Sequence, residues 1–384
     1  MIPLRNIRRF FYKTCSQPAY AFRVFEKRLK AYFYYLFGNG RSGYPEAITL
    51  FLTHRCNLRC KMCGQWGESG VTKKMLPGLI GEELSFGELR DFIDDISAFK
   101  PNITLFGGEP LLYPHCLDLI RYIKNKNLHC LIITNGSLLN EFAKDLIDTR
   151  LDELNISLDG DKNLHDEIRG MPGLFEKITS GLKEVNRLKK EKGFRRPLIN
   201  LQCTISQYNY KYLDKLIEVA KDIGADSLTY HNLIFLGKDL IERQKVYDEL
   251  LSCSSEDWKG FVFEPGINPD GLYAKIKDIL RKGYPFSIDF YPNLSLKGLR
   301  EYYTNSSYAP SEYPARCISP WIVAYIFPDG EVRPCLNFSY SYGNIRKDKF
   351  SLIWNSEKAV NFRKTLKEKR LFPVCARCTE LYRY

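Results

Sequence analysis

The sequence lacks both a stretch able to cross a membrane and a segment that would direct export. Its longest early apolar run, AYFYYLF, covers only residues 31–37, whereas a spanning helix needs roughly 18 apolar residues. The apolar-then-small-residue pattern of a secretory signal is also missing, as are internal repeats. These absences predict a cytoplasmic globular protein, and the content of 44% hydrophobic and 27% charged residues agrees with that class.

The twelve cysteines do not fit a disulfide scaffold, because a chain without an export signal stays in a reducing compartment. Clustered thiols in that setting more often hold metal or carry out chemistry. Seven of the cysteines form two sets, one of three and one of four. The other five are scattered and are predicted to be small core residues: Cys15, Cys116, Cys130, Cys203 and Cys253.

The net charge of +12 is concentrated at the start of the chain, where residues 1–44 contain nine Lys and Arg against the single acid Glu26. Apolar residues recur there at helical spacing, so that one helix face is apolar and the other basic: Phe22, Phe25, Leu29, Phe33 and Leu36. Such a helix can lie on an anionic membrane, which predicts peripheral contact with the inner membrane face through residues 1–37. The alternative is a helix that docks on the main domain and exposes its basic face. Nucleic-acid binding is not expected, because a basic end without a recognisable binding fold is weak support for it.

Short β-rich segments alternate with longer amphipathic segments from residue 46 to about 232. Six such units predict an α/β fold with a parallel sheet, a partial (β/α)6 TIM-like barrel. One helical segment starts near Tyr210, keeps its apolar residues on one face and stops at Gly224. Another begins with Ser85 followed three residues later by Glu88, a capping-box pattern.

The rest of the chain predicts a late strand in FSIDFYP, a hairpin at Asp329-Gly330 and a helix from about Ser356 to Lys369. We therefore expect a basic aromatic helical segment over 1–45 and a core barrel over 46–235. Residues 236–310 would complete the barrel and connect it to a small C-terminal β-hairpin-plus-helix domain over 311–384.

The unusual short motifs fall where the predicted strands end, at the rim where β/α barrels place their active sites. Cys56, Cys60 and Cys63 follow the first strand, and the motif GGEP (107–110) follows the second. TNG (134–136), SLDG (157–160) and His231 end the third, fourth and sixth strands. Taken alone, TNG and SLDG are equally well explained as turns, but together the motifs occupy one rim.

Three thiols on one loop suit a 4Fe–4S cluster that leaves one iron open, whereas a closed zinc site needs four ligands. The spacing Cys56-x3-Cys60-x2-Cys63, together with Gly107-Gly108-Glu109-Pro110, resembles the radical SAM superfamily. The resemblance covers about residues 46–232. It implies that the open iron binds S-adenosylmethionine and that the reduced cluster cleaves it to a 5′-deoxyadenosyl radical, which abstracts hydrogen from a substrate. A reducing partner such as flavodoxin or ferredoxin would supply the electron.

By position in that family, the cofactor-binding residues would be those of the rim motifs. Gly107, Gly108 and Glu109, with Pro110 closing the motif, would receive the methionine amino group, and Ser157 and Asp159 would face the ribose with Asn135 nearby. Met62 stands where the family usually has an aromatic residue beside the adenine. The segment HDEIRGMPGLF (165–175) resembles members with an extra cluster domain, although its His165 and Arg169 fit capping or salt-bridging roles better.

The second set, Cys317, Cys335, Cys375 and Cys378, resembles the twitch form of the SPASM domain. There four cysteines fully ligate an auxiliary 4Fe–4S cluster; the alternative from the residues alone is a zinc ribbon. A closed cluster can accept an electron, which favours oxidation of a small sugar-like or phosphate-bearing molecule. Asp289 and His231 are base candidates by position only. The alternatives are a peptide- or protein-modifying enzyme and, more remotely, a non-enzymatic metal-binding scaffold.

Overall fold

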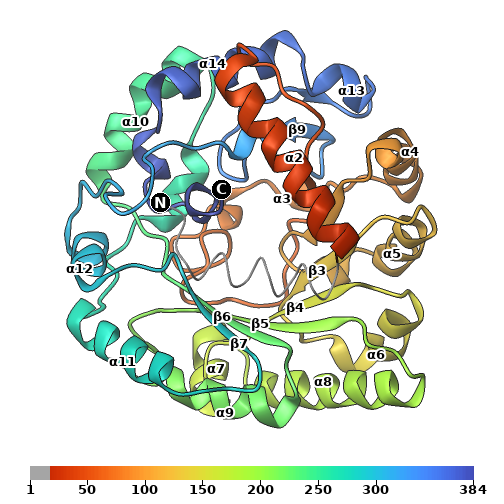
Figure 1. Ribbon diagram of the computed structural model, residues 1–384, viewed down its shortest axis with the longest axis vertical. Helices are drawn as coiled ribbons and strands as arrows, with labels where there is room; N and C mark the ends of the chain where they lie inside the picture. Colours follow the sequence, from red (N-terminus) through yellow and green to blue (C-terminus); the bar gives the residue numbers. More distant parts are fainter. Residues whose placement is uncertain (1–17) are drawn as a thin grey trace.

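The structure is a computed structural model that describes residues 18–384, an α/β fold built around one ten-stranded sheet (Figure 1). Seven strands lie parallel in chain order: β1 (Ala47–Phe51), β2 (Asn102–Phe106), β3 (Cys130–Thr134), β4 (Glu153–Ser157), β5 (Leu198–Thr204), β6 (Ser227–His231) and β7 (Ser287–Tyr291). The predicted partial barrel is confirmed, and the late strand in FSIDFYP adds a seventh parallel strand to the six expected.

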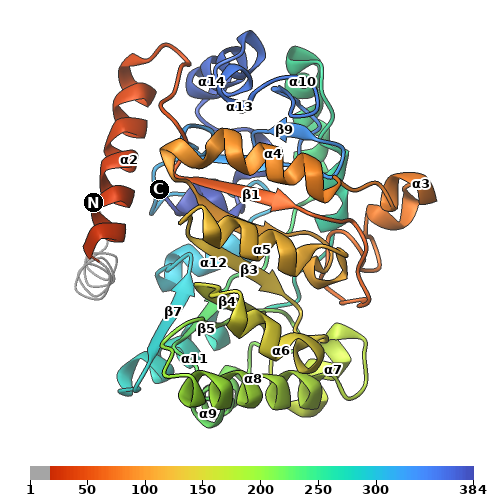
Figure 2. The ribbon, with the colours of Figure 1, turned by 90° about the vertical axis from the view of Figure 1, so that its right-hand side faces the viewer.

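Helices cover the outside of the curved sheet (Figures 1 and 2). Those between successive strands are α4 (Phe86–Ile96), α5 (Cys116–Asn125), α6 (Leu139–Asp148), α7 (Lys162–Arg169), α8 (Leu174–Glu191), α9 (Leu213–Ile223), α10 (Lys238–Leu251) and α11 (Pro269–Arg281). The short α3 (Pro77–Ile80) precedes α4, and α12 (Leu296–Thr304), α13 (Phe350–Ile353) and α14 (Glu357–Lys369) follow β7.

The local sequence signals that predicted these helices are present as contacts. Ser85 caps α4, its hydroxyl accepting from the Glu88 N–H while the Glu88 carboxylate accepts from the Ser85 N–H. Helix α9 buries its apolar face, Leu213, Leu216, Ile217, Ala220 and Ile223, and ends at Gly224 in the left-handed conformation (φ 73°). Local patterning therefore determines where these elements begin and end.

The C-terminal hairpin continues the barrel sheet instead of forming a separate one. Strand β8 (Val323–Ile326) pairs in parallel with β1, from Ala47 opposite Val323 to Leu50 opposite Ile326. Strands β9 (Glu331–Arg333) and β10 (Gly343–Asn344) then extend the same edge antiparallel. The predicted turn is confirmed, with Gly330 at φ 85°.

Helix α2 (Pro18–Phe37) lies across the ends at which the strands begin, as Figure 2 shows on the side opposite α3. Its buried residues are Ala31 and Tyr35, while the apolar residues noted in the sequence are exposed. The predicted helix and its docking on the main domain are confirmed, but Lys27 and Arg28 lie on the docked side, and the exposed side holds the apolar residues together with Arg23 and Lys30. Residues 1–17, the rest of the predicted membrane-contacting segment, and Cys15 lie outside the described residues. No helix among residues 18–384 is long and apolar enough to cross a bilayer.

Candidate functional site

The loop after β1 places three thiols among hydrogen-bond donors. The Cys63 sulfur accepts from the Trp66 N–H at 3.3 Å, and the Cys60 sulfur lies 3.7 Å from a guanidinium nitrogen of Arg169. The Cys56 sulfur lies 3.9 Å from the Asn135 amide nitrogen. Burial raises the pKa of the Cys56 thiol to about 11 and also raises that of Cys60.

This donor set fits an iron–sulfur cluster. N–H groups lie within hydrogen-bonding reach of the sulfurs and would stabilise cluster-bound thiolates. A bound cationic cluster would supply the positive charge that these buried thiols need in order to ionise. No group of three or more His, Cys, Asp or Glu within residues 18–384 is arranged to hold a single metal ion.

The two glycines of GGEP let the loop after β2 lie against the cysteine loop. A Cβ on Gly107 would stand 2.6 Å from the Thr53 carbonyl oxygen, and one on Gly108 would stand 2.2 Å from that of Arg55. Both distances are shorter than real Cβ contacts, and Gly107 has φ 149°. The glycines are therefore required by backbone packing inside the chain, whereas their contact with S-adenosylmethionine remains a prediction.

Glu109 joins the ends of β2 and β3. Its side chain is fully buried, and its carboxylate accepts from the Thr134 hydroxyl at 2.6 Å, the Asn135 N–H at 2.8 Å and the Leu111 N–H at 3.1 Å. Burial raises the pKa of this carboxyl, and the three donors oppose that rise. GGEP and TNG thus form one hydrogen-bonded unit beside the cysteine loop, and Pro110 is buried in the same turn.

Asp159 and Arg169 form a buried ion pair that reaches the cysteine loop. The Arg169 Nε donates to Asp159 at 2.5 Å, and the second carboxylate oxygen accepts from the Thr204 N–H at 2.9 Å. The Asp159 side chain has no exposed surface, which does not favour its predicted ribose contact. The expected salt-bridging role of Arg169 is present, and its contact with Cys60 was not predicted. Ser157 ends β4 and is half-buried.

Met62 borders a small cleft of about 120 Å³ beside the cysteine loop. Ser206 and Gln207, just after β5, and Leu233, just after β6, line the same cleft. The cleft therefore lies on the rim where the adenine was expected, and a thioether can pack against an aromatic ring there.

The two candidate bases, His231 and Asp289, lie on the neighbouring strands β6 and β7. The His231 Nε2 is 2.6 Å from the Gln202 side-chain oxygen, and the Ser287 hydroxyl is 3.4 Å from the Asp289 carboxylate. Neither residue lines the large cavity described next.

The four late cysteines line one wall of a cavity of about 540 Å³, part of which a cluster would fill. Burial raises the pKa of the Cys378 thiol to about 12 and raises those of the other three further. The lining also includes Gly64, next to Cys63, and His54, two residues before Cys56. The cavity therefore extends from the second cysteine set to residues next to the first set, whose own three cysteines do not line it.

Several residues that line this cavity were not identified as site residues from the sequence. Aromatic side chains of Phe51, Trp258, Phe261 and Phe327 line it, and its charged groups include Asp257 and Arg333. Arg333 lies 4.0 Å from the Phe327 ring centroid and pairs with Glu331 at 2.7 Å. The only sequence signal for His54 and Arg333 is that each stands two residues before a cysteine of a set.

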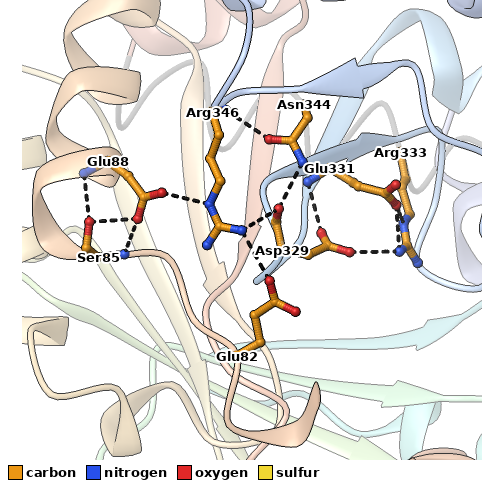
Figure 3. Close-up of polar contacts among 8 residues, drawn as sticks. All are labelled: Glu82, Ser85, Glu88, Asp329, Glu331, Arg333, Asn344 and Arg346. Carbon is orange, nitrogen blue, oxygen red and sulfur yellow. Dashed lines mark hydrogen bonds and ion pairs between the residues drawn. The ribbon is translucent and has the colours of Figure 1, made fainter. Parts of the chain in front are cut away.

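A network on one side of this cavity connects the hairpin to the barrel, as Figure 3 shows. The Arg346 guanidinium pairs with Glu88 at 2.7 Å and Glu82 at 3.2 Å, and donates to the Asp329 carbonyl at 3.0 Å. Glu82 and Asp329 both line the cavity, so this arginine bridges two residues of its lining.

Two family models match the parts of the chain that hold the two cysteine sets. Residues 50–200 match the radical SAM superfamily, and residues 317–379 match the SPASM iron–sulfur cluster-binding domain. The chain is therefore a radical SAM enzyme with a C-terminal SPASM domain. Its cofactors are S-adenosylmethionine, the 4Fe–4S cluster that binds it, and an auxiliary 4Fe–4S cluster.

Curated relatives are similar over most of both chains. An AdoMet-dependent heme synthase of Methanosarcina barkeri is 28% identical over 340 residues, which cover 87% of this chain and 88% of that protein. A tungsten-containing aldehyde ferredoxin oxidoreductase cofactor-modifying protein of Pyrococcus furiosus is 26% identical over 355 residues, 86% of each chain. The crystal structure of Streptococcus suis SuiB bound to the precursor peptide SuiA has a TM-score of 0.61 at 13% identity, covering 85% of this chain and 69% of that one. It shares the fold.

Proposed function

We propose that the enzyme oxidises a small oxygenated molecule held in the cavity between the two cysteine sets. The observation that carries this proposal is the continuity of the 540 Å³ cavity from Gly64 to Cys317, Cys335, Cys375 and Cys378. A molecule in it would lie between the place where a radical forms and the place where an electron can leave.

Bound S-adenosylmethionine and the reduced first cluster supply a 5′-deoxyadenosyl radical. The substrate carbon then loses a hydrogen atom, which forms the C–H bond of 5′-deoxyadenosine. The resulting carbon radical would lose the proton of its hydroxyl and one electron to give a carbonyl group, and the auxiliary cluster would be the electron acceptor. One electron would be consumed at the first cluster in cleaving S-adenosylmethionine to methionine and the radical, and a different electron, from the substrate, would leave at the second.

The chain's own groups suit the binding and deprotonation steps. The aromatic wall excludes water, and Arg333 and His54 provide polar contacts for an oxygen-rich substrate. Four carboxylates line the cavity, and Glu82, Asp329 and Glu380 are each paired with an arginine. We assign the role of accepting the hydroxyl proton to the fourth, Asp257, whose pKa is raised by burial. We favour Asp257 over His231 and Asp289 because only Asp257 lines the cavity.

The relatives that share the most of their length favour a small-molecule substrate, although a bacteriocin subtilosin biosynthesis protein of Bacillus subtilis is also 25% identical over 83% of this chain. The heme synthase and the cofactor-modifying protein are similar over nearly their whole length, whereas the likeness to peptide-bound SuiB is one of fold. We therefore keep peptide modification as the second candidate, with flavodoxin or ferredoxin as the reductant in either case.

The test begins with anaerobic reconstitution, iron counting and an assay for 5′-deoxyadenosine with a strong reductant. We expect about eight irons per chain and nucleoside formation that a Cys56→Ala, Cys60→Ala, Cys63→Ala variant abolishes. Nucleoside formation by that variant would refute the radical chemistry, and an absence of turnover by the wild type would favour a binding scaffold.

Candidate substrates are then compared by transfer of deuterium from the substrate carbon into 5′-deoxyadenosine. Asp257→Asn should retain that transfer but form the carbonyl product at least about tenfold more slowly. If Asp289→Asn forms the carbonyl product as fast as the wild type, the result agrees with Asp257 as the base. If Asp289→Asn instead retains deuterium transfer but loses carbonyl formation, Asp257 is not the base. Transfer from peptides alone would establish the second candidate.

A further inference from the structure

Helix α2 exposes a continuous apolar stripe on the outside of the molecule. Its members are between 51% and 70% exposed and recur every three or four residues along the helix: Phe22, Phe25, Leu29, Phe33, Leu36 and Phe37. Exposed apolar patches of this kind on a folded protein mark surfaces that bind a partner or a membrane.

Contacts on the opposite side of the helix hold this stripe outward. Tyr35 packs edge-on against Trp321 with ring centroids 5.1 Å apart. The Lys27 ammonium donates to the carbonyls of Phe99 at 2.7 Å and Lys100 at 2.9 Å, just before β2, and Arg28 pairs with Glu46 at 2.7 Å, just before β1. The helix is therefore attached to the barrel through Lys27, Arg28 and Tyr35, which leaves the apolar stripe outside.

Cations lie near the stripe. Arg23 and Lys30 are exposed on α2 itself, where Lys30 pairs with the exposed Glu26, and the Lys367 ammonium donates to the Leu36 carbonyl at 2.8 Å. In sequence, the seventeen residues before the helix add four Lys and Arg and no acid. An apolar stripe with a cationic border is complementary to an anionic lipid surface, where the side chains enter the acyl boundary and the cations meet the headgroups.

We propose that α2 is an interfacial anchor that binds the enzyme to an anionic bilayer through this stripe. The helix lies at the ends where the strands begin, and the cysteine loop lies at the ends where they finish (Figure 2). The anchor therefore leaves the first cysteine loop on the side turned away from the lipid, while the cavity extends back to Ser319 and Pro320, next to the Trp321 on which Tyr35 packs. This orientation does not depend on the identity of the substrate.

The test is flotation of the full-length reconstituted protein with vesicles of phosphatidylcholine containing about one third phosphatidylglycerol. The variant Leu29→Glu, Phe33→Glu adds two charges to the stripe and should reduce vesicle binding at least about tenfold. The matched control is Val246→Glu, Leu250→Glu, which changes two residues of similar exposure, 67% and 56%, on α10. Iron content and 5′-deoxyadenosine formation without lipid should be the same in all three proteins.

Binding by the wild type and the α10 control, with loss in the α2 variant, supports the anchor. Failure of the wild type to float with these vesicles would overturn it, as would equal binding by the α2 variant. A second copy of the chain is the other occupant that an apolar stripe suits. If the wild type is a dimer that the α2 variant converts to a monomer, the stripe is a subunit interface and the proposal fails.

Discussion

Glu109→Gln tests whether the ends of β2 and β3 depend on a buried carboxylate. The substitution keeps the shape of the side chain but replaces one oxygen by an NH2 group. If that group faces Asn135, the Asn135 N–H loses its acceptor; if it faces Thr134, the Leu111 N–H loses its acceptor instead. One buried backbone donor is therefore unsatisfied in either orientation.

The expected loss of stability follows from these contacts. An unsatisfied buried donor costs about 1–3 kcal/mol, and the remaining hydrogen bonds lose their charged acceptor, while relief from burying a charge offsets part of the loss. We expect the free energy of unfolding to fall by about 2–3 kcal/mol, measured from the urea midpoint of the anaerobic holoenzyme at unchanged slope. Formation of 5′-deoxyadenosine should fall as well, because the displaced turn lies against the cysteine loop.

The control is Glu82→Gln, which removes one partly exposed ion pair with Arg346 at 3.2 Å. We expect it to cost less than about 1 kcal/mol. If Glu109→Gln is as stable and as active as Glu82→Gln, the buried carboxylate does not organise the two strand ends and the reasoning is refuted.

Three further predictions concern the auxiliary site, the ion pair and acid stability. Cys375→Ser should lower the iron content from about eight to about four per chain while 5′-deoxyadenosine formation without substrate persists; loss of that activity would contradict separate roles for the two sets. Arg169→Gln leaves Asp159 buried without its cation and should lower the free energy of unfolding by about 3 kcal/mol in urea titrations; an unchanged midpoint would count against the ion pair. Burial lowers the pKa of His165 to about 4 from an ordinary 6.5, so below pH 6.5 the unfolded chain binds a proton that the folded chain excludes. The free energy of unfolding should thus fall as the pH drops from 6.5 towards 4, by about 2 kcal/mol at pH 5. The His165→Asn variant should lack this decrease in the same titration, and an equal decrease in the variant would show that another group causes it.

Much of this architecture could be predicted because it is encoded locally. The apolar spacing and Gly224 determined α9, and the paired motifs at strand ends located the rim of the site. Pairings between distant segments could not be predicted in the same way. Nothing in the sequence near Val323 indicates that this residue pairs with Ala47. Nothing in SLDG indicates that the Asp159 carboxylate forms an ion pair with Arg169.

Helix α2 shows the same limit in another form. The periodicity of the sequence predicted the apolar stripe of the helix. The side of the helix that packs on the barrel depends on the carbonyl groups of Phe99 and Lys100, which lie about seventy residues further along the chain and accept from Lys27. Likewise, Asp257 became a candidate base only when the fold placed it in the cavity wall. A residue's type indicates what chemistry it can perform, whereas its access to a substrate depends on the tertiary fold.

The parallel pairing of β8 with β1 has a mechanical consequence. The first cysteine loop leaves the end of β1, and β8 lies between Cys317 and Cys335, so one ladder of backbone hydrogen bonds connects the two metal-binding regions. The first cysteine loop follows the end of β1, whereas Cys317 precedes the start of β8, so the separation of the two regions runs along these paired strands and does not depend on a hinge between domains. Because electron tunnelling slows steeply with distance, a fixed separation keeps the rate of electron transfer uniform from one turnover to the next. The same ladder means that the two regions should unfold together, in a single cooperative step.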